Sequence, residues 1–219
     1  MPRASVRAAS RTCDTLGTLR CPMSDLRKVV HHYFQQSTDV LERTVAAPGF
    51  VDAVVVSAQR IAESLRQGGK LLIAGNGGSA ADAQHIAGEF VSRLNFDRAP
   101  LPAIALTTDS SVLTAIGNDY GFEHVFERQV RGLGRHGDVL LAISTSGRSP
   151  NVLRALETAR ALEMTSIGFT SQKGAAMVAL CDLALVVPSE VTQLIQQVHI
   201  TAAHIICELV EADMFGESH

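Results

Sequence analysis

Apolar positions recur at helical spacing up to about residue 67 and occur in short continuous runs after it. Leu26, Val30 and Tyr33, for example, lie three or four residues apart, which is the spacing of one helix face. Ala47-Pro48-Gly49 interrupts the helical pattern, and Gly68-Gly69 ends it. The pattern therefore predicts two N-terminal helices within residues 24–67, arranged as a helical hairpin.

Five short apolar runs follow, at residues 70–74, 102–106, 138–144, 165–170 and 183–187. Helical patterns separate or follow them, at residues 79–94, 109–117, 123–133, 151–163, 173–180 and 189–214. Near-continuous apolar strands that alternate with helices are typical of a parallel sheet covered on both faces. Such sheets bind ligands at the carboxyl ends of their strands. We therefore predict an α/β fold with a doubly wound, five-stranded parallel sheet.

The first 22 residues differ from the rest of the chain. They contain four arginines and one acidic residue, Asp14, and lack the apolar segment of a secretory signal. The composition is loosely similar to a transit peptide, but a disordered extension upstream of a start at Met23 is the simpler interpretation. We expect a single domain over residues 23–219 that includes the helices of residues 24–67.

Composition excludes several classes of function. The net charge of −3 gives no electrostatic reason to expect a nucleic acid or an anionic membrane as partner, and no apolar run reaches the roughly 20 residues of a membrane span. The four cysteines have no CxxC spacing, which suits a reducing compartment. We expect a cytoplasmic protein.

A glycine-rich loop, AGNGGSAAD (residues 74–82), directly follows the first predicted strand and opens a helix. Its glycines allow the backbone to approach an anion, the helix N-terminus offers free N–H donors, and Ser79 adds a hydroxyl. The loop also fits the dinucleotide-binding pattern G-x-G-x-x-A, with Asp109 roughly where a ribose ligand is expected. This loop alone supports phosphate and dinucleotide binding about equally.

A second loop distinguishes phosphate binding from dinucleotide binding. The third predicted strand ends in STSGRS (residues 144–149), and Pro150 and Asn151 open the next helix. One hydroxyl there would be explained as a helix cap, but four in six residues favour a cradle for a phosphate monoester.

Candidate chemistry lies on two helices. His85 and Glu89 are four residues apart and share a helix face, which suits a metal or a proton-transfer pair, although such pairs are also common surface neighbours. The last predicted helix carries Gln196, His199 and His204. Spacing does not decide whether these residues are core side chains, zinc ligands or contributions to a neighbouring subunit.

Four segments, residues 75–93, 101–130, 137–155 and the last helix, closely resemble phosphoheptose isomerases of the sugar isomerase (SIS) superfamily. The resemblance covers residues 24–215. It implies a flavodoxin-like sheet and a homotetramer with active sites between subunits. It also implies an aldose–ketose isomerase that converts D-sedoheptulose 7-phosphate to D-glycero-D-manno-heptose 7-phosphate through an enediolate. That reaction is the first step towards ADP- or GDP-heptose precursors, for example for lipopolysaccharide.

The resemblance also assigns roles to residues. It implies that Glu89 is the base and His204 its acid/base partner. A zinc ion would be bound by His85, Glu89, Gln196 and His204. The substrate would contact Asn76, Gly77, Ser79, Glu89, Asn118, Asp119, Ser144, Thr145, Ser146, Ser149 and Gln196.

This chain departs from the family pattern at Gln197, where many members have Glu, and at Arg148, where Asn or Lys is also seen. Three other functions compete with the isomerase interpretation. A related protein that associates with the replication initiator lacks the equivalents of Glu89 and His204, both of which this chain has. The other candidates are an isomerase of a different sugar phosphate and a sugar-phosphate-sensing regulator.

Overall fold

The computed structural model describes residues 23–216, so the extension predicted for residues 1–22 lies outside the described residues. The chain divides between Gln35 and Gln36 into two units. The first contributes the N-terminal half of helix α1 (Met23–Val45), and the second contains everything from Gln36 onward. The expectation of a single domain over residues 23–219 stays a prediction.

The break between the two N-terminal helices falls where the sequence predicts it. Helix α1 ends at Val45, and α2 (Phe50–Arg66) begins directly after Gly49, whose φ of 76° is a left-handed conformation that suits glycine. Val40, near the end of α1, is buried in a small cluster with Leu194 and Ile195. The end of α1 is thereby packed onto the C-terminal helix.

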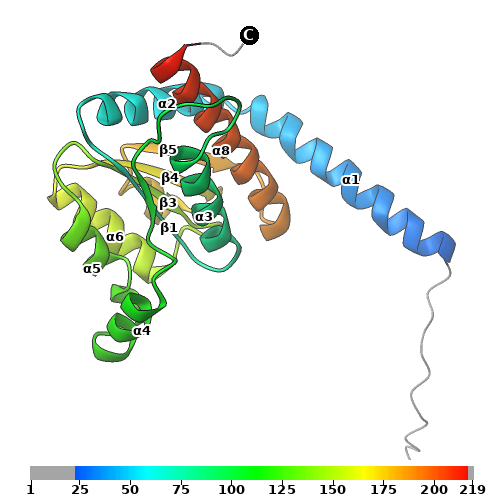
Figure 1. The fold of residues 1–219 in the computed structure, drawn as a ribbon. Coiled ribbons are helices and arrows are strands. Elements are labelled where there is room, and N and C mark those ends of the chain that lie inside the picture. The colour runs from blue at the N-terminus through cyan, green and yellow to red at the C-terminus, as the bar shows by residue number, and fades with distance from the viewer. Residues whose placement is uncertain (1–22, 217–219) are drawn as a thin grey trace, which may run out of the picture. The chain divides into compact units, whose positions relative to one another are not determined.

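The five predicted strands form one parallel sheet: β1 (Leu71–Gly75), β2 (Ala103–Ala105), β3 (Val139–Ile143), β4 (Thr165–Ser171) and β5 (Leu183–Val187). Their spatial order is β2-β1-β3-β4-β5, and every neighbouring pair is parallel (Figure 1). This is the flavodoxin-like order. Strands β1 and β3 lie at the centre and are completely buried, as their continuous apolar runs predict.

Alternating residues of the central strands face two separate cores. Leu71 and Ile73 of β1 pack with α2, α3 (Gly78–Val91) and α8 (Thr192–Phe215) on one face. Leu72 and Ala74 face the other core. Helices α4 (Ser110–Asp119), α5 (Glu127–Leu133), α6 (Pro150–Ala161) and α7 (Ala175–Val178) contribute to that second core. The doubly wound architecture is confirmed.

Two predicted helices are shorter than expected. The stretch 123–133 is divided into a 3₁₀ turn, η1 (Phe122–His124), and α5, and the stretch 173–180 reduces to the four residues of α7. The prediction at 173–180 was wrong because residues that flank α7 are hydrogen-bonded to other parts of the chain. The Asp182 carboxylate accepts hydrogen bonds from the N–H and hydroxyl of Ser166, which ties the chain after α7 to β4.

Among the described helices, none is by itself both long and apolar enough to cross a membrane. The pair formed by residues 25–45 of α1 and by α2, with a bend between them, passes that test of length and composition.

Candidate active site

The strand order places the two polar loops side by side. Strands β1 and β3 are neighbours, and Gly75 pairs with Ile143, so the chain leaves both strands at the same edge. Connections from β1 and β3 diverge at this point, which makes it the topological switch point where open α/β sheets bind ligands. The amides of Asn76 and Asn151 donate to each other's oxygens, both at 2.9 Å, and so join the first loop to the start of α6.

The hydroxyl-rich loop is folded as one compact turn. The Ser144 hydroxyl lies 3.2 Å from that of Ser149 and accepts a hydrogen bond from the Gly147 N–H. Gly147 has a φ of 60°, and a Cβ there would clash with the backbone of Gly174, so the turn requires glycine. Ser146 is exposed, and Thr145 is half-buried. Ser144 is buried, so Ser146, Thr145 and Ser149 are the accessible hydroxyl side chains of this loop, and they suit a phosphate cradle.

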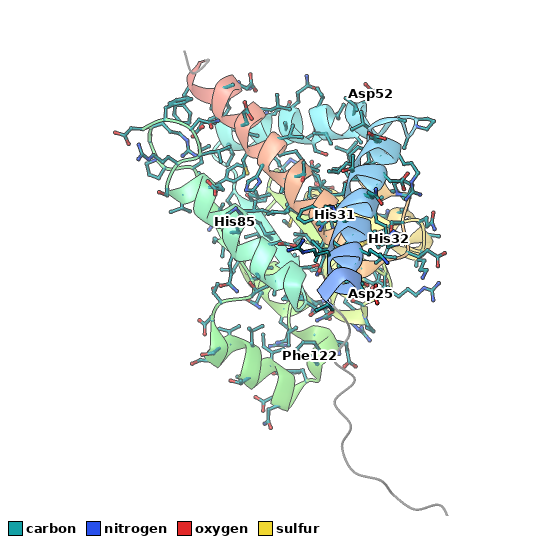
Figure 2. All side chains as sticks on the ribbon, turned by 90° about the vertical axis from the view of Figure 1, so that its right-hand side faces the viewer. Asp25, His31, His32, Asp52, His85 and Phe122 are labelled. Atoms are coloured by element: carbon teal, nitrogen blue, oxygen red, sulfur yellow. The ribbon has the colours of Figure 1, made fainter. Side chains whose placement is uncertain are left out.

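A cavity of about 360 Å³ adjoins these loops. It is lined by Asn76, Phe122, Glu123, Ser149, Pro150 and Asn151. Figure 2 shows the Phe122 side chain on the turn after α4, on a different segment from His85. The predicted sugar contacts Asn118 and Asp119 end α4; both are exposed, and the Asn118 amide donates to the Asp119 carboxylate. Their contact with a substrate stays a prediction.

The first loop leads into α3 without a side-chain cap. Gly77 precedes the helix with a φ of 57°, and Ser79 is buried against Gly75. Asp109, considered above as a ribose ligand, accepts a hydrogen bond from the Val112 N–H and caps α4 instead.

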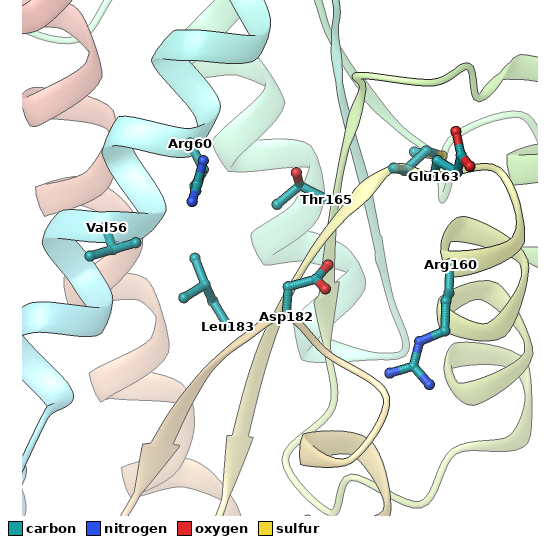
Figure 3. Close-up of a pocket in the computed structure, with 8 residues that line it drawn as sticks. Val56, Arg60, Arg160, Glu163, Thr165, Asp182 and Leu183 are labelled. Atoms are coloured by element: carbon teal, nitrogen blue, oxygen red, sulfur yellow. The ribbon is translucent and has the colours of Figure 1, made fainter.

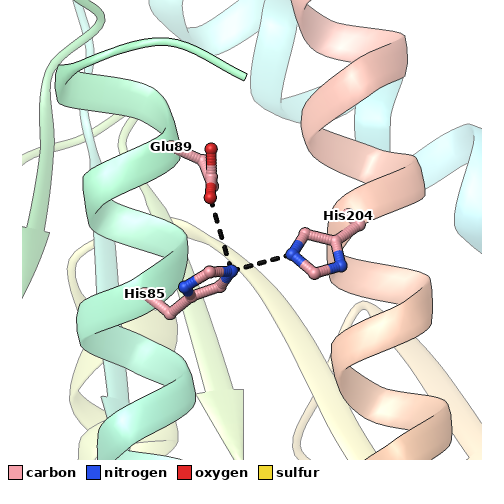
Figure 4. A group of neighbouring side chains, drawn as sticks. All are labelled: His85, Glu89 and His204. Carbon is pink, nitrogen blue, oxygen red and sulfur yellow. Dashed lines mark hydrogen bonds and ion pairs between the residues drawn. The ribbon is translucent and has the colours of Figure 1, made fainter. Parts of the chain in front are cut away.

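His85, Glu89 and His204 form one cluster across α3 and α8 (Figure 4). The Nε2 atoms of the two histidines are 2.7 Å apart, and His85 Nε2 is 3.3 Å from Glu89 Oε1. The imidazole rings meet edge to face. The structure thus brings together three of the four metal ligands and both of the acid/base residues named from the sequence.

The donor set of this cluster fits zinc. Two imidazole nitrogens and a carboxylate oxygen are common zinc ligands, and all three donor atoms lie within 4.8 Å of one another. Ligands held tetrahedrally at the usual bond lengths are about 3.3 Å apart. The pair formed by His85 and Glu89 has that separation, and the two histidines need to move apart only slightly.

Gln196, the fourth proposed ligand, lies eight residues before His204 on α8. Its side-chain amide occupies the space that a side chain at Gly78 would fill, in the first turn of α3. Gln196 therefore adjoins the glycine-rich loop in this structure, and its role as a zinc ligand stays a prediction. His199 is a core residue, 1% exposed, with Nε2 donating to the Thr170 carbonyl at 3.1 Å.

Three polar atoms on the same helices are buried without a hydrogen-bond partner in the described part of the chain: Asp82 Oδ2 on α3, and Gln197 Oε1 and His199 Nδ1 on α8. Burial raises the pKa of the Asp82 carboxyl, although the neighbouring His85 acts in the opposite direction. Gln197 is one of the two positions at which this chain departs from the family pattern.

Another cavity, of about 420 Å³, lies at the opposite edge of the sheet (Figure 3). Thr165 and Leu183, the first residues of β4 and β5, line it. Its charged side chains already have partners within the chain: Arg160 donates to the carbonyls of Ala179 and Leu180, for example. This cavity lies away from the loops at the carboxyl ends of the strands.

The fold and site together define a protein with a SIS domain, and the model of that family matches residues 32–171. The chain belongs to the phosphoheptose isomerase family. It is 54% identical over 189 residues to the phosphoheptose isomerase of Burkholderia pseudomallei strain 1710b, covering 84% of this chain and 96% of that relative. It is 51% identical over 199 residues to that of Roseiflexus sp. strain RS-1, covering 91% of this chain and 100% of the relative.

Solved structures agree with this assignment. Phosphoheptose isomerase GmhA from Neisseria gonorrhoeae is 43% identical and superimposes with a TM-score of 0.80 over 85% of this chain and 99% of that one. A phosphoheptose isomerase from Francisella tularensis is 38% identical, with a TM-score of 0.81 over 86% and 98% of the two chains.

Sequence reasoning missed several residues that build this region. Asn151 was noted only as a helix start, yet its amide bridges the two loops. Phe122 and Glu123 line the cavity because η1 follows α4 directly. The position of Asn151 just after the hydroxyl-rich loop, at the switch point, was the available signal for its role.

Proposed function

We propose that this protein interconverts D-sedoheptulose 7-phosphate and D-glycero-D-manno-heptose 7-phosphate. The observation that carries the proposal is the cluster of Glu89, His85 and His204 on helices beside two phosphate-suited loops. Relatives that align over nearly their whole length are named phosphoheptose isomerases, which supports the same substrate here. Because the chain has both Glu89 and His204, the non-catalytic reading as a replication-initiator partner is disfavoured.

The phosphate would be bound by the two loops at the switch point. Ser144, Thr145, Ser146 and Ser149 offer hydroxyls on one side, and the N-terminus of α3 with Ser79 offers donors on the other. Asn76 and Gly77 would contact the sugar, and Asn118 and Asp119 would lie further along it. The 360 Å³ cavity beside Asn76 and Ser149 provides space for part of the sugar chain.

The carboxylate and the imidazole divide the proton transfers between them. Glu89 would remove the proton from C1 of the ketose, which breaks the C1–H bond and gives an enediolate across C1 and C2. His204 would donate a proton to the oxygen on C2 and accept the one from the oxygen on C1. Glu89 then returns its proton to C2, which leaves an aldehyde at C1, so that the reaction consumes no oxidant or reductant.

We infer that one zinc ion per subunit is held by His85, Glu89 and His204, with Gln196 as the fourth ligand after its amide turns away from Gly78. Bound zinc would stabilise negative charge on an enediolate oxygen. The fit of the donor set to zinc, given above, supports this inference.

A homotetramer with sites between subunits is the assembly we propose. Apolar side chains on the two helices that carry the cluster are exposed in the single chain, namely Val91 (51%), Ile205 (44%) and Leu209 (37%). A neighbouring subunit would cover them. Light scattering on the purified protein tests this directly, because a monomer in solution would contradict it.

We further propose a cytoplasmic location and a place in heptose precursor synthesis for surface glycans such as lipopolysaccharide. Cys181 and Cys207 are both free, and burial raises the pKa of each thiol to about 12. Two free thiols suit a reducing compartment. We propose neither nucleic acid nor membrane as a partner.

Substrate profiling tests the proposed function. Purified protein is incubated with sedoheptulose 7-phosphate and, in parallel, with fructose 6-phosphate and ribulose 5-phosphate, and the aldose products are separated by anion-exchange chromatography. Aldoheptose formed at a rate well above that of the shorter aldoses supports the proposal. Preference for a shorter ketose would assign the chain to a different sugar phosphate, and absence of turnover with all three would favour a binding role.

A further inference from the structure

Three contacts, one after another along the helix, connect α8 with α3 and with the segment that follows α3. Gln196 lies over Gly78 at the start of both helices, and His85 meets His204 two turns further along. Beyond them, a buried carboxylate, Glu211, holds the segment that follows α3. The two helices therefore run in the same direction, and the contact between His85 and His204 in the candidate site lies between the other two.

The third contact is an almost fully buried ion pair between Arg98 and Glu211. Arg98 Nε lies 2.9 Å from Glu211 Oε1, and the two side chains are only 3% and 1% exposed. The same carboxylate accepts hydrogen bonds from the backbone N–H groups of Leu94 at 3.1 Å and Asn95 at 2.8 Å. Burial acts to raise the pKa of Glu211, but these hydrogen bonds outweigh it and hold the pKa below its usual value.

Arg98 connects this carboxylate to the helix that carries Glu89. Its Nη2 donates to the backbone carbonyl of Glu89 at 2.7 Å, and its Nη1 donates to that of Phe90 at 2.8 Å. The last carbonyls of a helix have no partner within the helix, and a guanidinium near them also interacts favourably with the helix dipole. One side chain therefore holds the backbone of Glu89 itself and is fixed to α8 through Glu211.

We propose that Arg98 and Glu211 are positioning residues, which hold α3 and α8 in the register that brings Glu89 and His85 to His204. The inference rests on the proposed roles of Glu89 and His204. Seven residues separate His204 from Glu211, which is about 10 Å along a helix. At that distance the Glu211 carboxylate does not touch the substrate, and Arg98 binds the backbone carbonyl of Glu89, so the pair acts through the helix backbones.

A contribution to the stability of the fold is a weak explanation for such a buried ion pair. A buried ion pair often contributes no more than apolar side chains of similar size, whereas removal of one partner leaves an unpaired buried charge. A positioning role and a merely structural role therefore predict different results when both charges are removed together. In a structural role, an apolar pair that restores stability also restores activity. In a positioning role, it restores stability without activity, because apolar side chains cannot bind the Glu89 carbonyl.

The chain offers a matched control. Arg66 and Asp213 form an ion pair of 2.8 Å between α2 and α8, two residues beyond Glu211, with side chains 48% and 47% exposed. An exposed pair of this kind contributes little, and it touches neither α3 nor the backbone of Glu89. Asp213→Asn therefore removes a charge from the same helix without disturbing the register of α3.

The test compares Glu211→Gln, the double variant Arg98→Met/Glu211→Leu, Asp213→Asn and Glu89→Gln with the wild type. For each, kcat and KM for sedoheptulose 7-phosphate are measured on protein shown to be folded and assembled by thermal melting and light scattering. We expect Glu211→Gln and the double variant to lose at least tenfold in kcat while KM changes less than threefold, since the phosphate loops are untouched. Asp213→Asn keeps the wild-type kcat.

The outcomes separate the two hypotheses. Wild-type kcat in the folded double variant, with no turnover by Glu89→Gln, would overturn the positioning role and leave the proposed function intact. Wild-type turnover by Glu89→Gln would overturn the proposed role of Glu89, and the positioning role with it. Glu211→Gln keeps an oxygen that accepts from the Leu94 or Asn95 N–H group, and the double variant has no unpaired charge, so whichever of the two folds decides by its kcat.

Discussion

Acidification should destabilise this protein through His199, a buried residue outside the candidate catalytic cluster. Burial lowers the pKa of His199 from 6.5 to about 4, and the hydrogen bond to the Thr170 carbonyl only partly opposes this effect. Nε2 donates that bond, so the second proton would go to Nδ1, which is buried and without a partner among the described residues. The folded protein therefore keeps this imidazole neutral where the unfolded chain has already taken up a proton.

The sign and size of the effect follow from linkage. Above pH 6.5 the ring is neutral in both states and contributes nothing to the pH dependence. Between pH 6.5 and about 4 the unfolded state binds the extra proton, so stability falls as the pH falls. The loss is about 2 kcal/mol at pH 5 and levels off at about 3 kcal/mol below pH 4, at 1.36 kcal/mol per pKa unit.

Urea unfolding at pH 7.5 and pH 5 measures this loss, at one fixed subunit concentration because assembly also contributes to stability. The comparison is His199→Gln, whose amide can still donate to Thr170 but does not titrate. Other groups cancel when the two proteins are compared, so the wild type should lose about 2 kcal/mol more than the variant between the two pH values. An equal loss in both proteins would show that His199 does not have the lowered pKa.

Other predictions concern the loops and helix α8. Ser146→Ala should raise KM roughly tenfold with little change in kcat, because one hydroxyl to a charged phosphate is lost; steady-state kinetics with an unchanged KM would argue against the cradle. Gln196→Ala should lower kcat/KM about tenfold, or about 1.4 kcal/mol, because it removes the fourth proposed zinc ligand. Its control, Gln193→Ala, changes an exposed glutamine in the first turn of the same helix and should keep wild-type kinetics, so equal rates for both glutamine variants would count against a role for Gln196.

Much of the fold could be predicted from the sequence because its strands are buried on both sides. Continuous apolar runs such as residues 138–144 have few alternatives to a central parallel strand. Short helices were less predictable: in residues 173–180 the helical pattern competes with contacts made by Gly174 and Asp182 to distant residues. Such long-range contacts leave no local signal.

Only the part of the candidate site that lies within one helix was predictable from local spacing. His85 and Glu89 are neighbours on one helix, so their spacing already places them together. The meeting of His85 with His204 joins residues that are 119 apart in sequence, and it depends on how α3 and α8 pack. Arg98 and Glu211 had no signal in local spacing, since their partners lie on segments that only the folded chain brings together.

The most direct test of the account compares wild-type protein with Glu89→Gln in conversion of sedoheptulose 7-phosphate to the aldoheptose phosphate. The variant has nearly the size of the original side chain but lacks a basic carboxylate. We predict turnover by the wild type and a loss of at least about a hundredfold in the variant, the usual contribution of a general base. Wild-type turnover by a folded Glu89→Gln protein would contradict the central claim that this carboxylate moves the substrate proton.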